Sequence, residues 1–375
     1  MKNILKTFTG GLEHMNLIKN KSKVLLSLFL IVTMLATIIS GCAPDTKTSK
    51  ESSNEANEPK TKIITDSAGR KVEIPKDIEK VVTVGPVGVL NCFVFAMGEG
   101  DKIANGLPPK FAKGDRWKYH KVFNPKIADN TVVEDGEGTI MIEKLIEVNP
   151  DLVFTMDEKT AEDIEDKGMK AIVLDWKDPE DVKEAVNLLG EIFNKPERAK
   201  EYSKYFDETL EKVNNIVSKI PQEKRVTALN TTLERLSLGH LVGEWWIEAA
   251  GGVSVSKDDR KTESSDYSME ELFNWNPDVL LVQTEKDKEF AYSDERFKDL
   301  KAVKDKKVYV TPVMGHVWAN RTMEQPLTVL WAAKLFYPEE MKDIDINEEL
   351  KTFSKKFFGY ELSDEECKDI LGDMK

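Results

Sequence analysis

Few side chains in this chain combine a reactive type with a placement suited to chemistry on a ligand. His240 and His316 stand in loops far apart in the sequence, and an imidazole is a common metal ligand. Arg321 can pair with an anionic group through two parallel hydrogen bonds, and an indole such as that of Trp117 can stack on a planar one. A lone histidine is more often a polar surface or core residue, so metal ligation and a structural role both stay open for His240 and His316.

Motifs of catalysis are missing from the sequence. It contains no CxxC, no HExxH, no zinc-ligand spacing, no nucleophile motif and no phosphate loop. The turn at residues 85–88 has two glycines and could cradle an anion, but it lacks the acidic partner of a dinucleotide site. The net charge of −13 does not favour nucleic acid. We expect a binding protein rather than an enzyme, with no cofactor of its own and no nucleic-acid partner.

One phrase occurs twice and predicts the architecture. Residues 142–154 read IEKLIEVNPDLVF, and residues 269–281 read MEELFNWNPDVLL. Each copy predicts a short amphipathic helix that begins near a glutamate (Glu143 or Glu270), ends at Asn-Pro-Asp and leads into an apolar strand. Although this is a common connection, a match of this length favours two similar lobes with a ligand cleft between them.

The remaining pattern predicts an α/β fold of two Rossmann-like lobes joined by one long helix. Strand and helix signals alternate from residue 81 to residue 193, which is typical of a mostly parallel sheet. A helical pattern then runs over residues 196–220, roughly 37 Å at 1.5 Å per residue. We assign residues 63–195 to the N-terminal lobe and residues 221–375 to the C-terminal lobe. A single helix between them predicts only a small hinge motion.

The first 62 residues have the pattern of a targeting signal followed by a tether. Residues 1–41 have the basic stretch, apolar run and small residues of a secretory signal, and Cys42 follows Ser-Gly as in a bacterial lipobox. Residues 42–62 have almost no apolar side chains, so we expect a disordered tether. Lipidation of Cys42 would hold the domain at the outer face of the cell membrane; an uncleaved signal anchor is the alternative. For Cys92 and Cys367 we expect free thiols rather than a disulfide.

Several segments in order resemble the helical-backbone (class III) substrate-binding lipoproteins of ABC importers of the iron-complex and cobalamin type. They are ITDSAGRKVEIP at 64–75, AMGEGDKI at 96–103, both repeat copies, AAGGV at 249–253 and PLTVLWAAKLFYPE at 326–339. The resemblance implies a monomeric receptor that delivers its ligand to a permease and its ATPase. It also implies that Glu143 and Glu270 dock onto the permease. The alternative is that each glutamate only favours its helix N-terminus through the helix dipole.

In such folds the ligand lies at loops after the carboxyl ends of the strands. Trp318-x-x-Arg321 matches a Trp-x-x-Arg found in the cleft of some relatives. One of Trp245 and Trp246 is expected in the core. Candidate loops carry Pro86, Trp117, Glu137 and Met156 in the N-terminal lobe, and Thr231, His240, Trp245, Ser264, His316, Trp318 and Arg321 in the other. As ligand-binding residues we predict Trp117, His240, Trp245, His316, Trp318 and Arg321, with His240 and His316 as metal ligands.

The resemblance implies an iron complex as ligand, namely a siderophore, heme or a related metal chelate. Cobalamin is disfavoured because Glu137 and Ser264 replace the aromatic residues of cobalamin-binding members. Acidic residues near the loops argue against a strongly anionic ligand; they are Glu134, Asp135, Glu137, Glu263 and Asp266. A nickel or cobalt chelate and molybdate are alternatives. A chelatase-like enzyme using His240 or Glu244, or a surface adhesin, would be a different class of protein.

Overall fold

The structure, a computed structural model, describes residues 60–258, 260, 262–263, 265–372 and 374. The predicted signal segment, Cys42 and nearly all of the predicted tether lie outside the described residues. The fold begins with a hairpin of β1 (Thr61–Thr65) and β2 (Lys71–Pro75), which pair antiparallel. The tether assignment therefore ran two residues into the first strand.

The N-terminal lobe is built on a parallel sheet in the order β3-β4-β5. Its strands are β3 (Val81–Thr83), β4 (Leu152–Thr155) and β5 (Ala171–Val173), and all of their residues are buried. Buried, uninterrupted apolar strands are typical of a parallel sheet covered on both faces. The helices of this lobe are α2 (Val87–Ala96), α3 (Pro109–Ala112), α4 (Lys118–Phe123), α5 (Ile142–Val148), α6 (Glu158–Glu165) and α7 (Pro179–Ile192).

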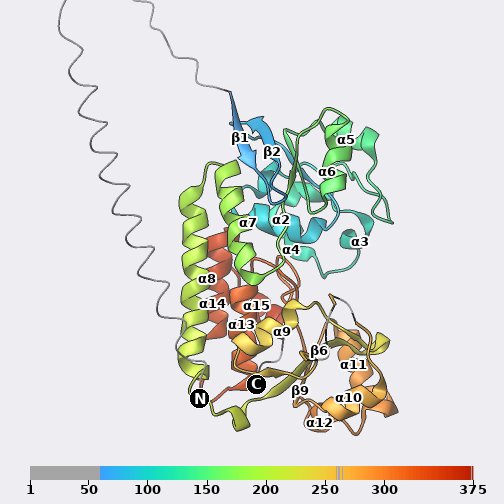
Figure 1. Ribbon diagram of the computed structural model, residues 1–375, viewed down its shortest axis with the longest axis vertical. Coiled ribbons are helices and arrows are strands. Elements are labelled where there is room, and N and C mark those ends of the chain that lie inside the picture. Colours follow the sequence, from blue (N-terminus) through green and yellow to red (C-terminus); the bar gives the residue numbers. More distant parts are fainter. Residues whose placement is uncertain (1–59, 259, 261, 264, 373, 375) are drawn as a thin grey trace, which may run out of the picture. The chain divides into compact units, whose positions relative to one another are not determined.

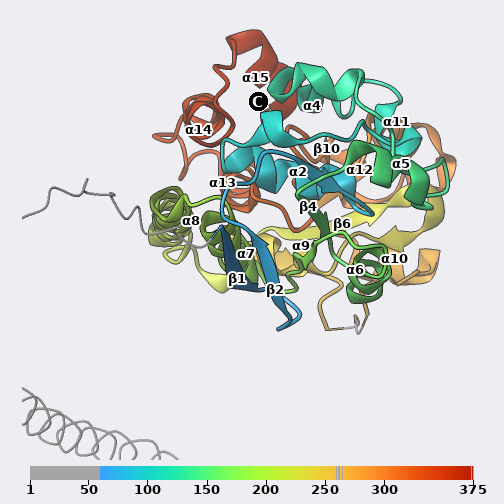
Figure 2. The same ribbon diagram turned by 90° about the horizontal axis from the view of Figure 1, so that it is seen from above.

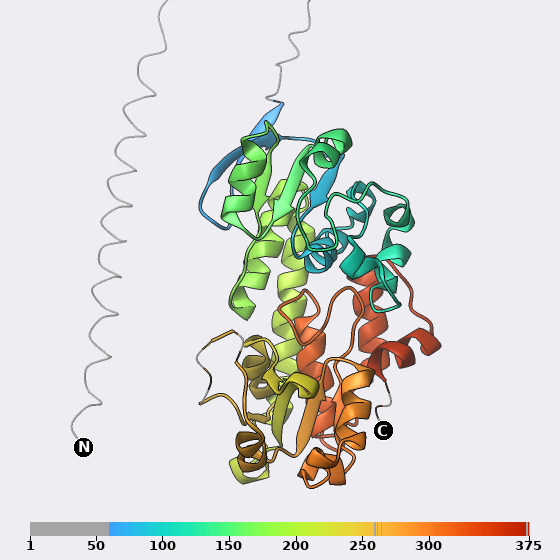
Figure 3. The same cartoon turned by 90° about the vertical axis from the view of Figure 1, so that its right-hand side faces the viewer.

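The C-terminal lobe has a mixed sheet in the order β10-β9-β6-β7, with β8 also pairing β6. Its strands are β6 (Thr227–Thr232), β7 (Ser237–Leu238), β8 (Val253–Ser254), β9 (Val279–Val282) and β10 (Val308–Val310). Only β7 runs antiparallel to its neighbour. The helices are α9 (Val242–Ala249), α10 (Met269–Trp275), α11 (Glu285–Ser293), α12 (Lys301–Lys304), α13 (Gln325–Phe336), α14 (Ile346–Phe353) and α15 (Asp364–Leu371). Figure 3 shows the two lobes one above the other.

Helix α8 (Pro196–Val217) joins the lobes, and its 22 residues span about 33 Å. It starts at Pro196, as expected for a residue that lacks an N–H to satisfy. One side of the helix is buried by residues at helical spacing, including Tyr202 and Phe206. Figures 1 and 2 show α7 beside α8, so the connection is a packed pair rather than an isolated rod.

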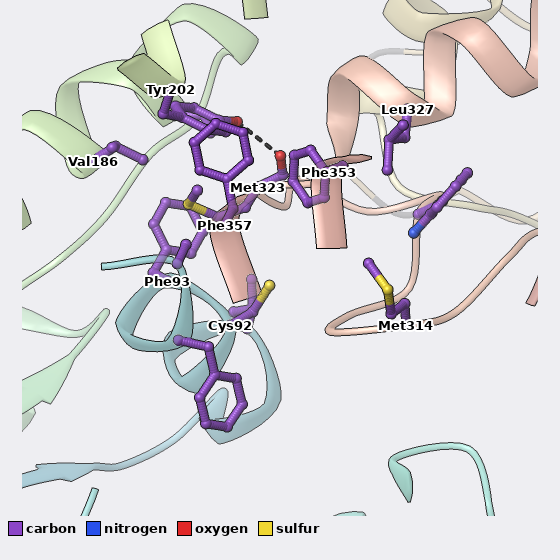
Figure 4. Packing of buried hydrophobic residues seen from close by; sticks show 14 of the residues in the cluster. Cys92, Phe93, Val186, Tyr202, Met314, Met323, Leu327, Phe353 and Phe357 are labelled. Atoms are coloured by element: carbon purple, nitrogen blue, oxygen red, sulfur yellow. Dashed lines mark hydrogen bonds between the residues drawn. The ribbon is translucent and has the colours of Figure 1, made fainter. Parts of the chain in front are cut away.

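The lobes also share one apolar core. It includes Cys92 and Phe93 of α2 together with Phe353 of α14 and Phe357 of the following π-helical turn (Ser354–Phe358). Figure 4 shows these side chains around Tyr202, whose hydroxyl donates to the Met323 carbonyl at 2.9 Å. The C-terminal segment thus packs against the N-terminal lobe, which leaves even less freedom for a hinge than a single helix would.

The two repeat copies adopt the same local structure. Asn149 and Asn276 end α5 and α10 in the left-handed conformation, with φ of 49° and 34°. The aspartates of Asn-Pro-Asp then hold the neighbouring strand: Asp151 accepts from the Lys80 N–H at 2.8 Å, and Asp278 accepts from the Thr227 N–H at 2.9 Å. The repeated phrase is therefore a device that stops a helix and sets the register of a parallel strand.

Candidate ligand-binding site between the lobes

Two of the predicted ligand-binding residues meet across the boundary between the lobes. The ring of Trp117, at the start of α4, stacks on the ring of His316, with centroids 5.1 Å apart and an interplanar angle of 29°. Next to this pair, His120 Nε2 lies 2.8 Å from the carbonyl of Gly315. The loop between β10 and α13 therefore contacts the N-terminal lobe at the point where sequence reasoning placed the ligand.

The buried side chain of Glu324 fixes the conformation of this loop. Its fully buried carboxylate accepts from the N–H groups of Gly315 at 2.9 Å and His316 at 2.8 Å. It also accepts from the indole N–H of Trp318 at 3.0 Å. Burial raises the pKa of the Glu324 carboxyl to about 7, although these donors act in the opposite direction. The backbone that carries His316 is thus fixed by one buried side chain.

His316 is half-buried and retains an unused ring nitrogen. Nδ1 has no hydrogen-bond partner among the described residues, and Nε2 lies 3.5 Å from the Asn320 side-chain amide. Burial lowers the pKa of His316 to about 3, with smaller effects from His120, His240 and Arg116. The imidazole is therefore neutral at physiological pH, which is the form that ligates a metal. Nδ1 is covered in this structure, so the side chains around it must move for a ligand to reach it.

Three more polar side chains, those of His240, Glu263 and Arg321, form a chain of hydrogen bonds at the same site. Glu263 Oε1 lies 2.8 Å from His240 Nδ1 and 2.8 Å from an Arg321 guanidinium nitrogen. Burial opposes ionisation of Glu263, but the hydrogen bond from His240 and the charge of Arg321 hold the pKa of Glu263 below its usual value. The Arg321 carbonyl accepts from the indole N–H of Trp176 in the N-terminal lobe at 3.3 Å.

Two of the acidic residues near the loops, Glu263 and Glu134, add little free negative charge to the site. Glu263 is matched by His240 and Arg321. Glu134 is fully buried, it accepts a hydrogen bond from the Gly85 N–H, and burial raises the pKa of its carboxyl. The sequence argument against an anionic ligand, which rested partly on these two residues, is therefore weaker in three dimensions.

Two predicted ligand-binding residues lie in packed surroundings instead. Trp318 is fully buried in the shared core and bonded to Glu324, so its indole face is not open to a ligand. Trp245 packs against Phe206 of the connecting helix, with centroids 6.4 Å apart. Its neighbour Trp246 is fully buried, so one of the two tryptophans lies in the core, as expected.

Sequence reasoning missed several residues at this site. Glu324 and Trp176 position the loop, and Arg116 acts electrostatically on His316. Beside Trp117 and His316, a cavity of about 340 Å³ lies between the lobes. Its lining includes Arg116, Lys118, Gln283, Thr284, Thr311 and Pro312. The last four of these residues could have been predicted from the sequence, because they follow the carboxyl ends of β9 and β10, where ligands bind in such folds.

The described residues contain no group of three or more His, Cys, Asp or Glu side chains that could hold a metal ion. The predicted pair of metal ligands, His240 and His316, thus has no third protein donor in this part of the chain. Glu244, a candidate acid/base group, accepts bonds from Ser254, Ser256 and Arg260 and serves the local structure. Cys92 and Cys367 are free and buried.

A profile of the family described as "Periplasmic binding protein" matches residues 98–313. The chain belongs to this family. It is 24% identical over 325 residues to the molybdate-binding protein MolA of Haemophilus influenzae, covering 79% of this chain and 91% of that protein. It is 28% identical over 190 residues to the heme uptake protein IsdE of Staphylococcus aureus, covering 46% and 62%. The structure of a periplasmic solute binding protein from Veillonella parvula superposes with a TM-score of 0.71 at 25% identity, covering 83% and 97%.

Membership confirms the predicted class: the protein is a class III solute-binding protein of an ABC importer, not an enzyme. The two-lobed α/β fold is confirmed with it. Across residues 60–372, apart from the three gaps, no helix is long and apolar enough to cross a membrane. The family is extracytoplasmic, in agreement with the predicted location outside the cytoplasm.

Proposed function

We propose that the solute carried by this binding protein is a metal complex, in the first place an iron complex such as a siderophore, heme or a related chelate. The observation that carries the proposal is His316, a neutral imidazole with a free ring nitrogen at the boundary between the lobes. Since no cluster of three donors accompanies it in the described residues, the metal would bring most of its own ligands. His316 would then fill one remaining coordination position.

The surroundings of His316 suit such a complex. Trp117 offers an aromatic face against a planar or apolar chelate once it separates from His316. Arg321 is one-fifth exposed and already paired with Glu263, so an anionic group on the chelate could share its guanidinium. His240 has a half-exposed side chain on the same carboxylate and could add a second nitrogen ligand. Nickel or cobalt chelates satisfy the same requirements.

Molybdate is the second candidate. The match to the relative with this name covers 91% of that relative's length. The site contains Arg321 and Arg116, while Glu263 is paired with Arg321 and Glu134 is buried. The two candidates differ in what they require. A metal chelate depends on the free nitrogen of His316, whereas an oxyanion depends on the guanidinium groups and on N–H donors.

A thermal-shift screen tests the proposal. Purified full-length protein is heated with ferric siderophores, heme, corrinoids, nickel–histidine or molybdate, because a ligand of the native state raises the melting temperature by mass action. Each hit is then titrated against His316→Ala and Arg321→Ala. A metal chelate predicts about a hundredfold weaker binding by His316→Ala. Molybdate binding that survives His316→Ala but is lost in Arg321→Ala would favour the second candidate and overturn the first.

We further propose how the protein reaches its partner. Glu143 and Glu270 open α5 and α10, both are exposed, and neither has an ion pair or hydrogen bond among the described residues. They are free to dock onto basic residues of a permease that works with an ATPase. We place the protein at the outer face of the cell membrane as a monomer, held by lipid on Cys42. Cys42→Ala should release it from the membrane fraction; unchanged processing and retention would refute the anchor.

A further inference from the structure

Exposed apolar side chains recur at one position of the repeat. In the described part of the chain, six large apolar residues are strongly exposed; they are Ile63, Val122, Ile146, Leu241, Phe273 and Tyr292. Ile146 is 52% exposed on α5, and Phe273 is 42% exposed on α10. A single exposed apolar residue needs no explanation. Two exposed apolar residues at the equivalent position of two repeat copies do need an explanation, because scattered surface residues would not be expected to coincide in this way.

Each of these residues shares a helix face with a proposed docking glutamate. Ile146 follows Glu143 by three residues and Phe273 follows Glu270 by three, which places each pair on neighbouring positions of one helix surface. Leu145 and Leu272 are fully buried and attach the two helices to their lobes. Each helix therefore presents an acidic and an apolar side chain together on its outer surface.

The fold itself does not use Ile146 or Phe273. Neither is a member of the hydrophobic cores formed by the described residues, and Phe273 takes part in no ring contact with those residues. By contrast, the exposed Tyr292 accepts a hydrogen bond from the Val308 N–H at 3.3 Å. Figure 1 shows α5 and α10 on the same side of the protein, one in each lobe. One partner can therefore contact both.

We propose that Ile146 and Phe273 are the apolar halves of two equivalent docking patches, whose acidic halves are Glu143 and Glu270. This inference rests on the proposed permease docking and adds the chemistry of the partner. The partner has two equivalent surfaces related by two-fold or pseudo-two-fold symmetry. Each surface offers a basic side chain next to an apolar pocket.

The two halves of a patch should act on different rates. Exposed charges steer association and lose strength as salt rises, whereas apolar contacts at the centre of an interface mainly slow dissociation. Replacing the glutamates should therefore slow association and reduce its salt dependence. Replacing Ile146 and Phe273 should speed dissociation and leave the salt dependence unchanged.

Photo-crosslinking in the cells that make the protein tests the contact itself. Full-length protein carrying p-benzoylphenylalanine at position 146 or at position 273 should form an adduct with an ABC permease subunit, identified by mass spectrometry. The same probe at Ile63, which is 70% exposed on β1, is the matched control and should form none. Adducts only with other proteins, or equal permease adducts from Ile63, would overturn the proposal.

A rate measurement separates this proposal from the one on which it rests. Membrane vesicles from cells lacking the gene are loaded with the full chain carrying Cys42→Ala, and release is followed after dilution. Ile146→Ser/Phe273→Ser should dissociate about tenfold faster, since burying two such side chains contributes on the order of a factor of ten. Ile63→Ser should dissociate at the same rate as the parent.

The outcomes distinguish the two proposals. If Glu143→Lys/Glu270→Lys abolishes binding but the double serine variant dissociates at the parent's rate, glutamate docking stands and the apolar inference fails. If the lysine variant also binds normally, the docking proposal itself fails.

Discussion

Two regions of the protein differ in repetition and in exposure. One consists of helices α5 and α10, and the other is the loop from Thr311 to Glu324. The helices occur twice, and their docking glutamates are exposed and unpaired among the described residues. The loop occurs once and lies between the lobes, where the buried carboxylate of Glu324 holds its backbone. Repetition suits a partner with two equivalent sites, whereas a single asymmetric loop suits one ligand. We therefore propose that the repeated helices serve delivery to the permease and that the unrepeated loop serves capture of the ligand.

The largest expected effect is on the free energy of unfolding, and it is seen by comparing one aromatic residue from each region. Trp318→Ala removes a fully buried indole and should lower the free energy of unfolding by about 3–5 kcal/mol. Phe273→Ala removes a half-exposed ring that is not a member of the hydrophobic core and should change the free energy of unfolding by less than about 0.5 kcal/mol. Urea unfolding of both variants measures the contrast. Equal effects would contradict the assignment of Trp318 to structure.

A second contrast uses two glutamates. Glu324→Ala leaves the N–H groups of Gly315, His316 and Trp318 without their acceptor, which should cost roughly 2–4 kcal/mol of unfolding free energy. Glu270→Ala removes an exposed carboxylate and should be close to neutral. Glu324→Ala should also weaken ligand binding, because the backbone that places His316 is no longer fixed. A stable variant with full affinity would show that Glu324 does not position the loop.

Acid should weaken the contact between the lobes through His120. Burial lowers the pKa of His120 from 6.5 to about 4, so the unfolded chain binds a proton more readily than the native state. Stability due to this group is present above about pH 6.5 and is lost as pH falls toward 4, by up to roughly 3 kcal/mol. Glu324 acts in the opposite sense, since its raised pKa makes stability fall as pH rises toward 7.

The His120 effect is therefore measured as a difference between two proteins. His120→Gln should show a shallower loss of melting temperature between pH 6.5 and pH 4.5 than the parent, although its stability at pH 7.5 is lower. The glutamine can still donate to the Gly315 carbonyl, which limits that loss. Parallel pH curves for the two proteins would refute the account.

A smaller stability effect is expected for Arg321 than for the buried residues Trp318, Glu324 and His120. Its ion pair with Glu263 is partly exposed, so Arg321→Ala should lower the free energy of unfolding by less than about 1 kcal/mol. The same change should weaken binding of an anionic chelate or of molybdate by at least about tenfold. Arg296→Ala is a matched control, because that guanidinium pairs with Asp294 on the surface and lies outside the proposed site. A large stability loss with retained affinity would make Arg321 structural.

Most of the architecture could be predicted because its signals are local. The apolar runs at 279–282 and 308–310 form strands with those bounds, and Pro196 starts the connecting helix. That helix ends at Val217 rather than at residue 220, where the chain turns instead. Strand β6 runs from Thr227 to Thr232, and it includes Asn230 and Thr231, which are buried and hydrogen-bonded despite their polarity.

The candidate site was less predictable because burial and partners are properties of the whole fold. Trp318 was chosen for its residue type, and nothing in the sequence shows that its indole N–H bonds to Glu324. Likewise, the assignment of residues 221–375 to one lobe did not anticipate that Phe357 and Phe358 pack on the N-terminal side. Trp117 and His316 could be named but not paired, since their stacking depends on how the lobes meet.

One titration tests the division between capture and delivery most directly. The ligand found in the thermal-shift screen is titrated calorimetrically into His316→Ala and into Glu143→Lys/Glu270→Lys at one pH and salt concentration. We predict about a hundredfold weaker binding by His316→Ala and unchanged affinity in the double lysine variant. Unchanged affinity in His316→Ala, or a comparable loss in the lysine variant, would contradict the assignment of the loop to the ligand and of the repeated helices to the permease.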